Sequence, residues 1–156
     1  MAEMGLKVGI KILGLDSAKL KLAAAKAEAK KTKPLFDKAI IILEQSHMKT
    51  FKMQGRPGWQ PSKRAKSQSG MTLQDTGRLR NSVTAKSPSA IREYNDKELH
   101  FGTKQPCGTS HQFGFPARNI PKRPFLGVYA EDIKKMEQVF GQDLTNRLRM
   151  VISTGE

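Results

Sequence analysis

The sequence predicts an α+β fold, in which about three helices pack on a small, mainly antiparallel β-sheet. Apolar residues recur at helical spacing in three long segments, and shorter alternating segments typical of strands lie among them. Stretches rich in glycine and proline separate these segments. Since 156 residues suffice for one modest domain, we expect a single domain over residues 1–156.

The first predicted element is a strand, because apolar side chains alternate with Lys and Gly from Leu6 to Ile12. A helix then runs to about Lys31, and Asp16 or Ser17 is its expected N-terminal cap. One face of this helix carries mostly small side chains and allows a close approach: Ala18, Leu22, Ala25 and Ala29.

A second helix is expected from Pro34, which suits a first helical turn. Its face is strongly apolar and comprises Phe36, Ile40, Leu43, His47 and Phe51. We therefore expect His47 to be a core or interface side chain. A long basic loop follows over residues 53–72. Its Gly55–Gly70 part holds two prolines, three glycines and no acid, so it is predicted to be mobile.

Residues 73–156 are predicted to form short elements and to end in a long helix. The closing helix has Glu131 and Asp132 near its start, where the helix dipole favours acids. Its apolar face comprises Ile133, Met136, Phe140, Leu144, Leu148 and Val151. The elements expected before it are a helix over Leu73–Leu79, a strand over Ser82–Lys86, a hairpin of Ile91–Tyr94 and Glu98–Phe101, turns over 102–124, and a strand over Phe125–Tyr129.

The charge is strongly positive and lies largely in loops. The formal net charge is +14, and the candidate contacts to phosphate or to an acidic partner are Arg56, Lys63, Arg64 and Lys66. Clustered cations suit a phosphate-binding surface. They equally suit solubility or an acidic protein surface, and we favour this second interpretation because no known nucleic-acid-binding module is recognisable.

Composition excludes several classes of protein. No apolar run approaches the roughly 20 residues of a membrane span, and the N-terminus lacks the pattern of a signal peptide. One cysteine and three scattered histidines give neither an internal disulfide nor a usual zinc site. We expect a soluble protein of a reducing compartment, without cofactor, metal or membrane partner.

The only candidate for nucleophilic catalysis is Cys107 with His111, four residues further on. The segment around them is rich in proline and glycine, and no acid within it could orient the histidine. Metal-dependent chemistry would need several carboxylates, and the basic middle of the chain offers only Asp75. We therefore predict no catalytic residues and interpret Cys107 as an incidental thiol.

In three segments, the order of residue types indicates a defined local structure. In Phe51–Trp59, a helix ends in glycine and Trp59 is expected to pack on the core. In Leu73–Ser82, Asp75 or Thr76 caps a short turn, Gly77 permits a tight approach, and the side chains of Leu73 and Leu79 point inward while those of Arg78 and Arg80 project. In His111–Gly127, prolines flank Lys122-Arg123 and are expected to display this basic pair ahead of a buried Phe125-Leu126.

Taken in order, these segments resemble the phage virion morphogenesis family, the tail-completion proteins of Mu-type and P2-type contractile-tailed phages. The family pattern has an aromatic–Gly–Trp element, a Leu…Thr-Gly-Arg-Leu-Arg-x-Ser element, His-Gln-Phe-Gly, and Ile-Pro-x-Arg-Pro-Phe-Leu-Gly. The resemblance spans about residues 36–135. It departs from the pattern at Cys107–Ser110, where the family usually has Tyr-Ala-x-x.

The resemblance implies a non-enzymatic, prophage-encoded protein that completes the tail or joins it to the head as an oligomeric ring. Its partners would be its own copies, tail-tube, terminator or head–neck proteins, and DNA as a further candidate; its location would be the host cytoplasm during assembly and the virion. The alternative function is a basic nucleic-acid-binding module. The candidate interface residues are Trp59, Thr76, Gly77, Arg78, Leu79, Arg80, His111, Gln112, Phe113, Gly114, Pro121, Arg123, Pro124 and Phe125.

Overall fold

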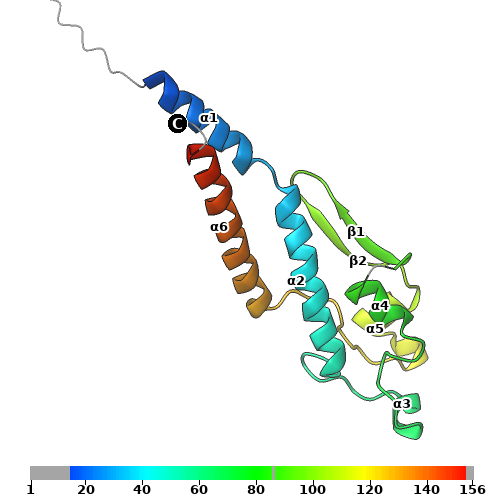
Figure 1. The fold of residues 1–156 in the computed structure, drawn as a ribbon. Coiled ribbons are helices and arrows are strands. Elements are labelled where there is room, and N and C mark those ends of the chain that lie inside the picture. Colours follow the sequence, from blue (N-terminus) through cyan, green and yellow to red (C-terminus); the bar gives the residue numbers. More distant parts are fainter. Residues whose placement is uncertain (1–14, 86, 154–156) are drawn as a thin grey trace, which may run out of the picture. The chain divides into compact units, whose positions relative to one another are not determined.

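The structure is a computed structural model that describes residues 15–85 and 87–153 (Figure 1). The strand predicted over Leu6–Ile12 lies outside the described residues. The predicted α+β class is confirmed. The elements in chain order are α1 (Leu15–Ala29), α2 (Lys33–Lys52), α3 (Lys63–Ser67), α4 (Arg78–Thr84), β1 (Ala90–Tyr94), β2 (Leu99–Thr103), α5 (Cys107–Phe113), the 3₁₀ helix η1 (Pro116–Arg118) and α6 (Ala130–Ser153).

The chain divides into two compact units, which are described separately. One unit, the helical unit, contains the residues up to Lys31 and those from Leu144 onward; the other, the central unit, is Thr32–Asp143. Helix α6 contributes its first part to the central unit and its last part to the helical unit. That residues 1–156 form a single domain stays a prediction.

In the helical unit, Arg147 of α6 binds the C-terminal end of α1 and the residues just after it. The Nη1 of Arg147 donates hydrogen bonds to the carbonyl oxygens of Glu28 and Lys31, at 3.1 and 3.0 Å. Helix α1 begins at Leu15, so Asp16 and Ser17 lie within its first turn rather than at the expected N-terminal cap. Over 19–31 and 144–153, no residue is buried.

The central unit has a compact core against α2. The apolar face predicted for this helix is largely confirmed, with Leu43, His47 and Phe51 buried and Pro34 in the first turn. The core cluster is Phe51, Trp59, Leu79, Val83 and Phe125. The aromatic rings of Phe51 and Trp59 meet edge to face, with centroids 5.3 Å apart, a favourable arrangement for two buried rings.

The predicted hairpin is confirmed. Strands β1 and β2 pair antiparallel with Tyr94 opposite Leu99. The Asn95 Oδ1 closes the turn by accepting hydrogen bonds from the backbone N–H groups of Lys97 and Glu98. The hairpin lies beside α2 (Figure 1), and the rings of His47 and Phe101 stack with centroids 5.1 Å apart.

Two predictions around residue 80 are wrong. The helix expected over Leu73–Leu79 begins only at Arg78, and residues 82–84 of the strand expected over Ser82–Lys86 are helical instead. The chain enters α4 through Gly77 at φ +73°, a left-handed conformation that suits glycine. The hydroxyls of Ser82 and Thr84 bond back to carbonyls of the preceding turn, which allows these poor helix formers in a short helix.

The strand expected over Phe125–Tyr129 is also absent: among the described residues this segment pairs with no strand. The turn-rich stretch over 102–124 holds α5 and η1, which were not predicted. The loop over 53–72 holds α3, whose N-terminal cap is the Ser62 Oγ accepting from the Ala65 N–H at 3.1 Å. The mobility of 55–70 stays a prediction.

The closing helix is confirmed as α6, with Glu131 and Asp132 in its first turn. Its predicted apolar face is amphipathic but incompletely covered. Ile133 is exposed, and the other five residues of that face are only partly buried. Within α6, only Asp132 is buried.

Candidate functional site

The three segments singled out in the sequence meet in one region of the central unit; they are Phe51–Trp59, Leu73–Ser82 and His111–Gly127. Trp59, Leu79 and Phe125, one from each segment, share the core cluster. The Trp59 Nε1 donates a hydrogen bond to the carbonyl oxygen of Pro124 at 2.9 Å. Gly55 is required beside this ring, because a Cβ on Gly55 would lie 2.6 Å from the Trp59 Cδ1. These residues therefore hold the three segments together, and Leu79 also lines the pocket described below.

Gln112 joins α5 to the segment that follows Pro124. Its Oε1 accepts hydrogen bonds from the backbone N–H groups of Phe125 and Leu126, both at 3.0 Å. Its Nε2 donates to the Leu126 carbonyl at 2.9 Å. The side chain satisfies three backbone groups that a neighbouring strand would otherwise satisfy, so Phe125 and Leu126 need no strand partner.

Arg123 is buried, contrary to the prediction that flanking prolines display the Lys122-Arg123 pair. Only 5% of Arg123 is exposed, whereas Lys122 is exposed as predicted. The Arg123 Nε donates to the Gln60 carbonyl at 2.7 Å, and its backbone N–H donates to the His111 carbonyl at 2.7 Å. Burial lowers the pKa of the Arg123 guanidinium, because desolvation disfavours its charged form.

A pocket of about 330 Å³ opens where the segments meet. We call it the motif pocket, since most of its lining comes from the segments singled out in the sequence. It is lined by Ser62, Arg64, Leu73, Asp75, Thr76, Gly77, Arg78, Leu79, Cys107, His111 and Arg123.

The electrostatics of the motif pocket are positive. Three arginines line it against one carboxylate, that of Asp75. The Asp75 side chain is 74% exposed and lies 3.6 Å from the Arg64 Nε. Burial, and secondly the charge of Arg123, lower the pKa of His111. The His111 Nδ1 is buried and has no hydrogen-bond partner among the described residues.

The motif pocket brings Cys107 and His111 together with Asp75, so the catalytic alternative can be examined directly. Cys107 is exposed at the first turn of α5. Within the part of the chain that the structure describes, no hydrogen bond joins the thiol to His111, and Asp75 pairs with Arg64. Nor do three or more His, Cys, Asp and Glu side chains gather there as metal ligands. The relay that a nucleophilic cysteine needs is not assembled.

The remaining candidates of the Thr-Gly-Arg element surround the start of α4. Thr76 is exposed, and its hydroxyl oxygen lies 3.4 Å from the Arg78 N–H. Arg78 projects as predicted and is exposed. Arg80 instead donates to the Gln74 Oε1 at 3.0 Å and to Asn81, so it braces the preceding loop.

The last motif candidates form an exposed turn after α5. Phe113 is 71% exposed although it belongs to the His-Gln-Phe-Gly element. Gly114 follows at φ +82°, and the turn closes through the bridge between Phe115 and Ile120. A second hollow lies here, lined in part by Phe113, Gly114 and Pro121.

Of the four basic-loop candidates, the structure leaves two on the open surface. Lys63 and Lys66 are exposed on α3. Arg64 donates to the Met71 carbonyl at 2.8 Å and lines the motif pocket. Arg56 is used inside the protein: its guanidinium lies over the Tyr129 ring, 3.7 Å from the centroid.

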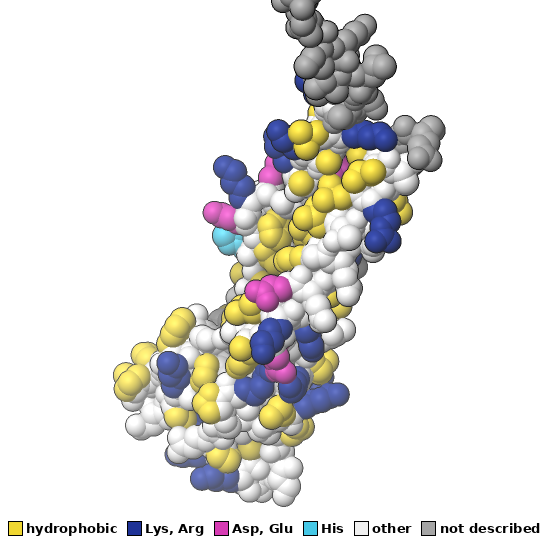
Figure 2. All heavy atoms as spheres, turned by 90° about the vertical axis from the view of Figure 1, so that its left-hand side faces the viewer, with side chains coloured by type: hydrophobic (Ala, Val, Ile, Leu, Met, Phe, Trp, Pro, Cys, Tyr) yellow, Lys and Arg dark blue, Asp and Glu magenta, His cyan; other side chains and the backbone are white. Residues whose placement is uncertain are grey.

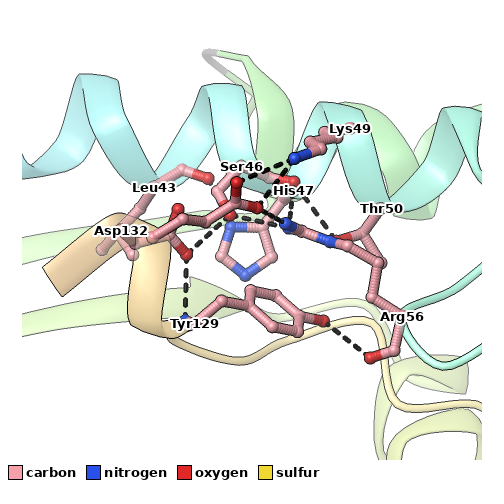
Figure 3. Close-up of polar contacts among 9 residues, drawn as sticks. Leu43, Ser46, His47, Lys49, Thr50, Arg56, Tyr129 and Asp132 are labelled. Atoms are coloured by element: carbon pink, nitrogen blue, oxygen red, sulfur yellow. Dashed lines mark hydrogen bonds and ion pairs between the residues drawn. The ribbon is translucent and has the colours of Figure 1, made fainter. Parts of the chain in front are cut away.

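A polar cluster that sequence reasoning missed surrounds Arg56 (Figure 3). The Arg56 Nη2 donates to the carbonyl and hydroxyl oxygens of Ser46, at 2.6 and 2.7 Å, and its Nη1 pairs with Glu131. The Lys49 Nζ lies 2.8 Å from the Glu131 Oε2, and this hydrogen bond holds the pKa of Glu131 below its ordinary value. The cluster joins α2, the loop after it and the start of α6.

Asp132 completes this cluster as a cap of α6. Its Oδ2 accepts from the Ser46 hydroxyl at 2.7 Å and from the Tyr129 N–H at 3.0 Å. An acid that reaches back to the residue before the helix is one half of a capping box. The sequence signal was the acid pair at the helix start, but its partner Ser46 lies 86 positions away.

His47 is a core side chain, as expected. It is 1% exposed, and its Nε2 accepts a hydrogen bond from the Gly127 N–H at 3.3 Å. The Nδ1 faces the Leu43 carbonyl and donates to it, so the ring is neutral with its proton on Nδ1. Burial lowers the pKa of His47, because the charged ring would lose its hydration.

With this geometry established, comparison with known proteins gives one result. A model of the phage virion morphogenesis family matches residues 14–145. The chain belongs to the phage virion morphogenesis family. No curated protein and no solved structure matches it.

The family match extends the resemblance seen in the sequence. That resemblance covered about residues 36–135, whereas the match begins at residue 14 and so includes α1. A virion morphogenesis protein has a structural or assembly role in forming the phage particle. In the described part of this family member, every helix is too short or too polar to span a membrane.

Proposed function

We propose that this protein completes the phage tail or joins it to the head, and that it acts without catalysis as a homo-oligomer in contact with tail or neck proteins. It would work in the host cytoplasm during assembly and remain in the tail or neck if incorporated. The observation that carries the proposal is the open apolar surface of the helical unit. Two helices with no buried residue over 19–31 and 144–153 have more to gain from a neighbouring subunit than from their own packing.

The exposed side chains of the helical unit support an assembly role. Leu20 and Leu22 are 72% and 58% exposed on α1, and Met150 and Ile152 are 66% and 56% exposed on α6. Hydrophobic side chains gather over these helices in Figure 2. Burying such surface stabilises an interface by roughly 25 cal/mol per Å².

A ring is the form of oligomer we propose. Identical subunits that use the same pair of patches satisfy every patch when a cyclic symmetry closes. The basic loop over 53–72 would then face neighbouring subunits or the tail tube. The number of subunits in the ring is set by the rotation between neighbouring subunits.

Deletion of the gene from an inducible prophage tests the role in assembly. We expect unjoined heads and tails, or tails of defective length, in electron micrographs of the lysate. A plasmid copy should restore infectious particles. Normal titres from the deletion strain would contradict the proposal.

The oligomeric state tests the role of the helical unit. We expect Leu20→Glu combined with Ile152→Glu to reduce the solution mass toward that of one chain, because charge on an apolar contact must be desolvated. Gln142→Glu combined with Asn146→Glu on α6 is the matched control, since it adds the same two charges at exposed polar positions. Native mass spectrometry or sedimentation gives the mass; equal masses for the control and the double variant would contradict this surface.

Cys107→Ser tests the absence of catalysis. The thiol has no assembled relay in the described structure, so the variant should complement the deletion as well as the wild-type gene does. A loss of infectious particles with normal expression and folding would return the Cys107–His111 pair to consideration.

The second candidate function is binding of nucleic acid through α3, and the observation that favours it is the exposure of Lys63 and Lys66. It predicts duplex binding that weakens steeply with salt, since each neutralised phosphate releases counterions. Lys63→Ala with Lys66→Ala should then reduce both the affinity and its salt dependence. Arg64 is left unchanged in this test because it supports Met71. Absence of binding at low salt would remove this candidate.

A further inference from the structure

The least compensated charge in the described core is Arg123. The residue is 5% exposed, yet no carboxylate of the described residues lies within ion-pair distance of its guanidinium. The one side-chain hydrogen bond found for it runs from Nε to Gln60. A guanidinium carries five N–H donors, and burying a cation is unfavourable unless an anion or hydrogen bonds compensate its lost hydration.

The surroundings add to this positive charge. Arg64, Arg78 and His111 line the same motif pocket, and its one carboxylate, Asp75, is mostly exposed and pairs with Arg64. The His111 Nδ1 is a buried ring nitrogen without a partner among the described residues. As an N–H it can donate to an oxygen placed in the pocket. The His111 Nδ1, from α5, and the Arg123 guanidinium, from the segment after it, thus line one cavity.

The walls of the motif pocket indicate what kind of anion fits. Leu73, Leu79 and Cys107 contribute apolar and sulfur atoms beside the arginines. The volume, about 330 Å³, is at the lower end for small-ligand sites. A carboxylate on a short aliphatic stem satisfies both features, because its methylenes contact the walls while its oxygens accept from guanidinium groups in a bidentate manner. A phosphodiester of duplex DNA offers no such stem and lies on a convex backbone.

We propose that the motif pocket is a receptor for an acidic side chain, Asp or Glu, of a partner protein in the virion. The identity of the partner as a virion protein rests on the proposed function, whereas the binding of a carboxylate rests on the pocket alone. The Thr-Gly-Arg and Pro-x-Arg-Pro elements would then serve one purpose: the first places Arg78 at the rim, and the second buries Arg123 beneath it.

The test is a titration of the full chain with sodium glutarate, a carboxylate on a short stem, followed by NMR of the arginine Nε–H and His111 imidazole signals. We expect saturable shifts of the Arg123 and His111 signals. Arg123→Gln should abolish the shift of the His111 signal, and Arg78→Gln, at an exposed position that leaves the core intact, should weaken binding at least threefold. Lys122→Gln is the control, because it removes an adjacent exposed charge that does not line the motif pocket.

Several outcomes would overturn the assignment. These are the absence of saturable shifts in the wild-type chain, equal affinity for Arg78→Gln and Lys122→Gln, or tighter binding of inorganic phosphate or a DNA duplex than of glutarate at the same signals. The titration uses the purified chain, so its result does not depend on virion assembly. Normal titres from the gene-deletion strain would contradict the proposed function without contradicting carboxylate binding. Conversely, if the chain does not bind glutarate but the deletion strain forms defective particles, only the carboxylate-binding assignment is contradicted and the proposed function stands.

Discussion

The central unit and the helical unit differ in how much of their surface they bury. The central unit buries aromatic side chains from three distant segments, and it satisfies its backbone through Gln112 and its helix start through Asp132. The helical unit has an amphipathic helix and exposed leucines, but no buried residue over 19–31 and 144–153. The first is held together by its own buried contacts, while the second leaves hydrophobic surface available for association.

The largest effect on stability is expected from a substitution in the core of the central unit. Phe125→Ala should lower the free energy of unfolding of the central unit by about 3–5 kcal/mol, because it leaves a cavity beside Phe51. Chemical denaturation followed by tryptophan fluorescence measures this, since Trp59 is in the same cluster. A loss below about 1 kcal/mol would mean that the core is not the source of stability.

The next test removes the hydrogen bonds by which Gln112 joins α5 to the segment after Pro124. Gln112→Ala should cost about 2–3 kcal/mol, since it leaves the Phe125 and Leu126 N–H groups without their acceptor. Gln138→Ala, at an exposed position on α6, is the matched control and should change stability by less than about 0.5 kcal/mol. Equal losses of unfolding free energy in the two variants would mean that the hydrogen bonds of Gln112 do not stabilise the fold.

The pH dependence of stability tests the buried histidine. Because burial lowers the pKa of His47 below 6.5, the unfolded chain binds this proton more readily, and stability falls as pH drops below about 6.5 toward the lowered value. Each unit of lowering corresponds to about 1.4 kcal/mol. The full contribution is present above pH 6.5.

His47→Gln should flatten this slope between pH 6.5 and 5 without abolishing it, because the pKa of His111 is lowered as well. Denaturant midpoints measured across this range give the slope. A variant with the same slope as the wild type would show that His47 is not the titrating group.

The smallest effect is expected in the helical unit. Leu22→Ala should change the free energy of unfolding of the isolated chain by less than about 0.5 kcal/mol, because 58% of the leucine is already exposed. The comparison is made on monomer at low concentration. A loss as large as that of Phe125→Ala would erase the distinction between the two units.

Local patterns were predictable where local forces decide. The hairpin followed from its alternation and from Asn95, and the long helices followed from their periodicity and from Pro34 or the acids at position 131 and 132. The prediction failed over residues 82–85 and 125–129, where β-rich composition suggested strands. There the side chains of Ser82, Thr84 and Gln112 satisfy the backbone, and no periodicity reveals such contacts.

The candidate site residues also show which properties the sequence determines and which depend on the tertiary structure. The sequence by itself determined the family, the fold class and the group of motif residues, because spacing, turn chemistry and residue identity are properties of the chain. Only the tertiary structure decided which cations face outward: Lys63 and Lys66 are exposed, whereas Arg56 and Arg123 turn inward. The physical reason is that burial and hydrogen-bond partners come from residues far apart in sequence, as with Ser46 and Asp132, and adjacent positions carry no record of them.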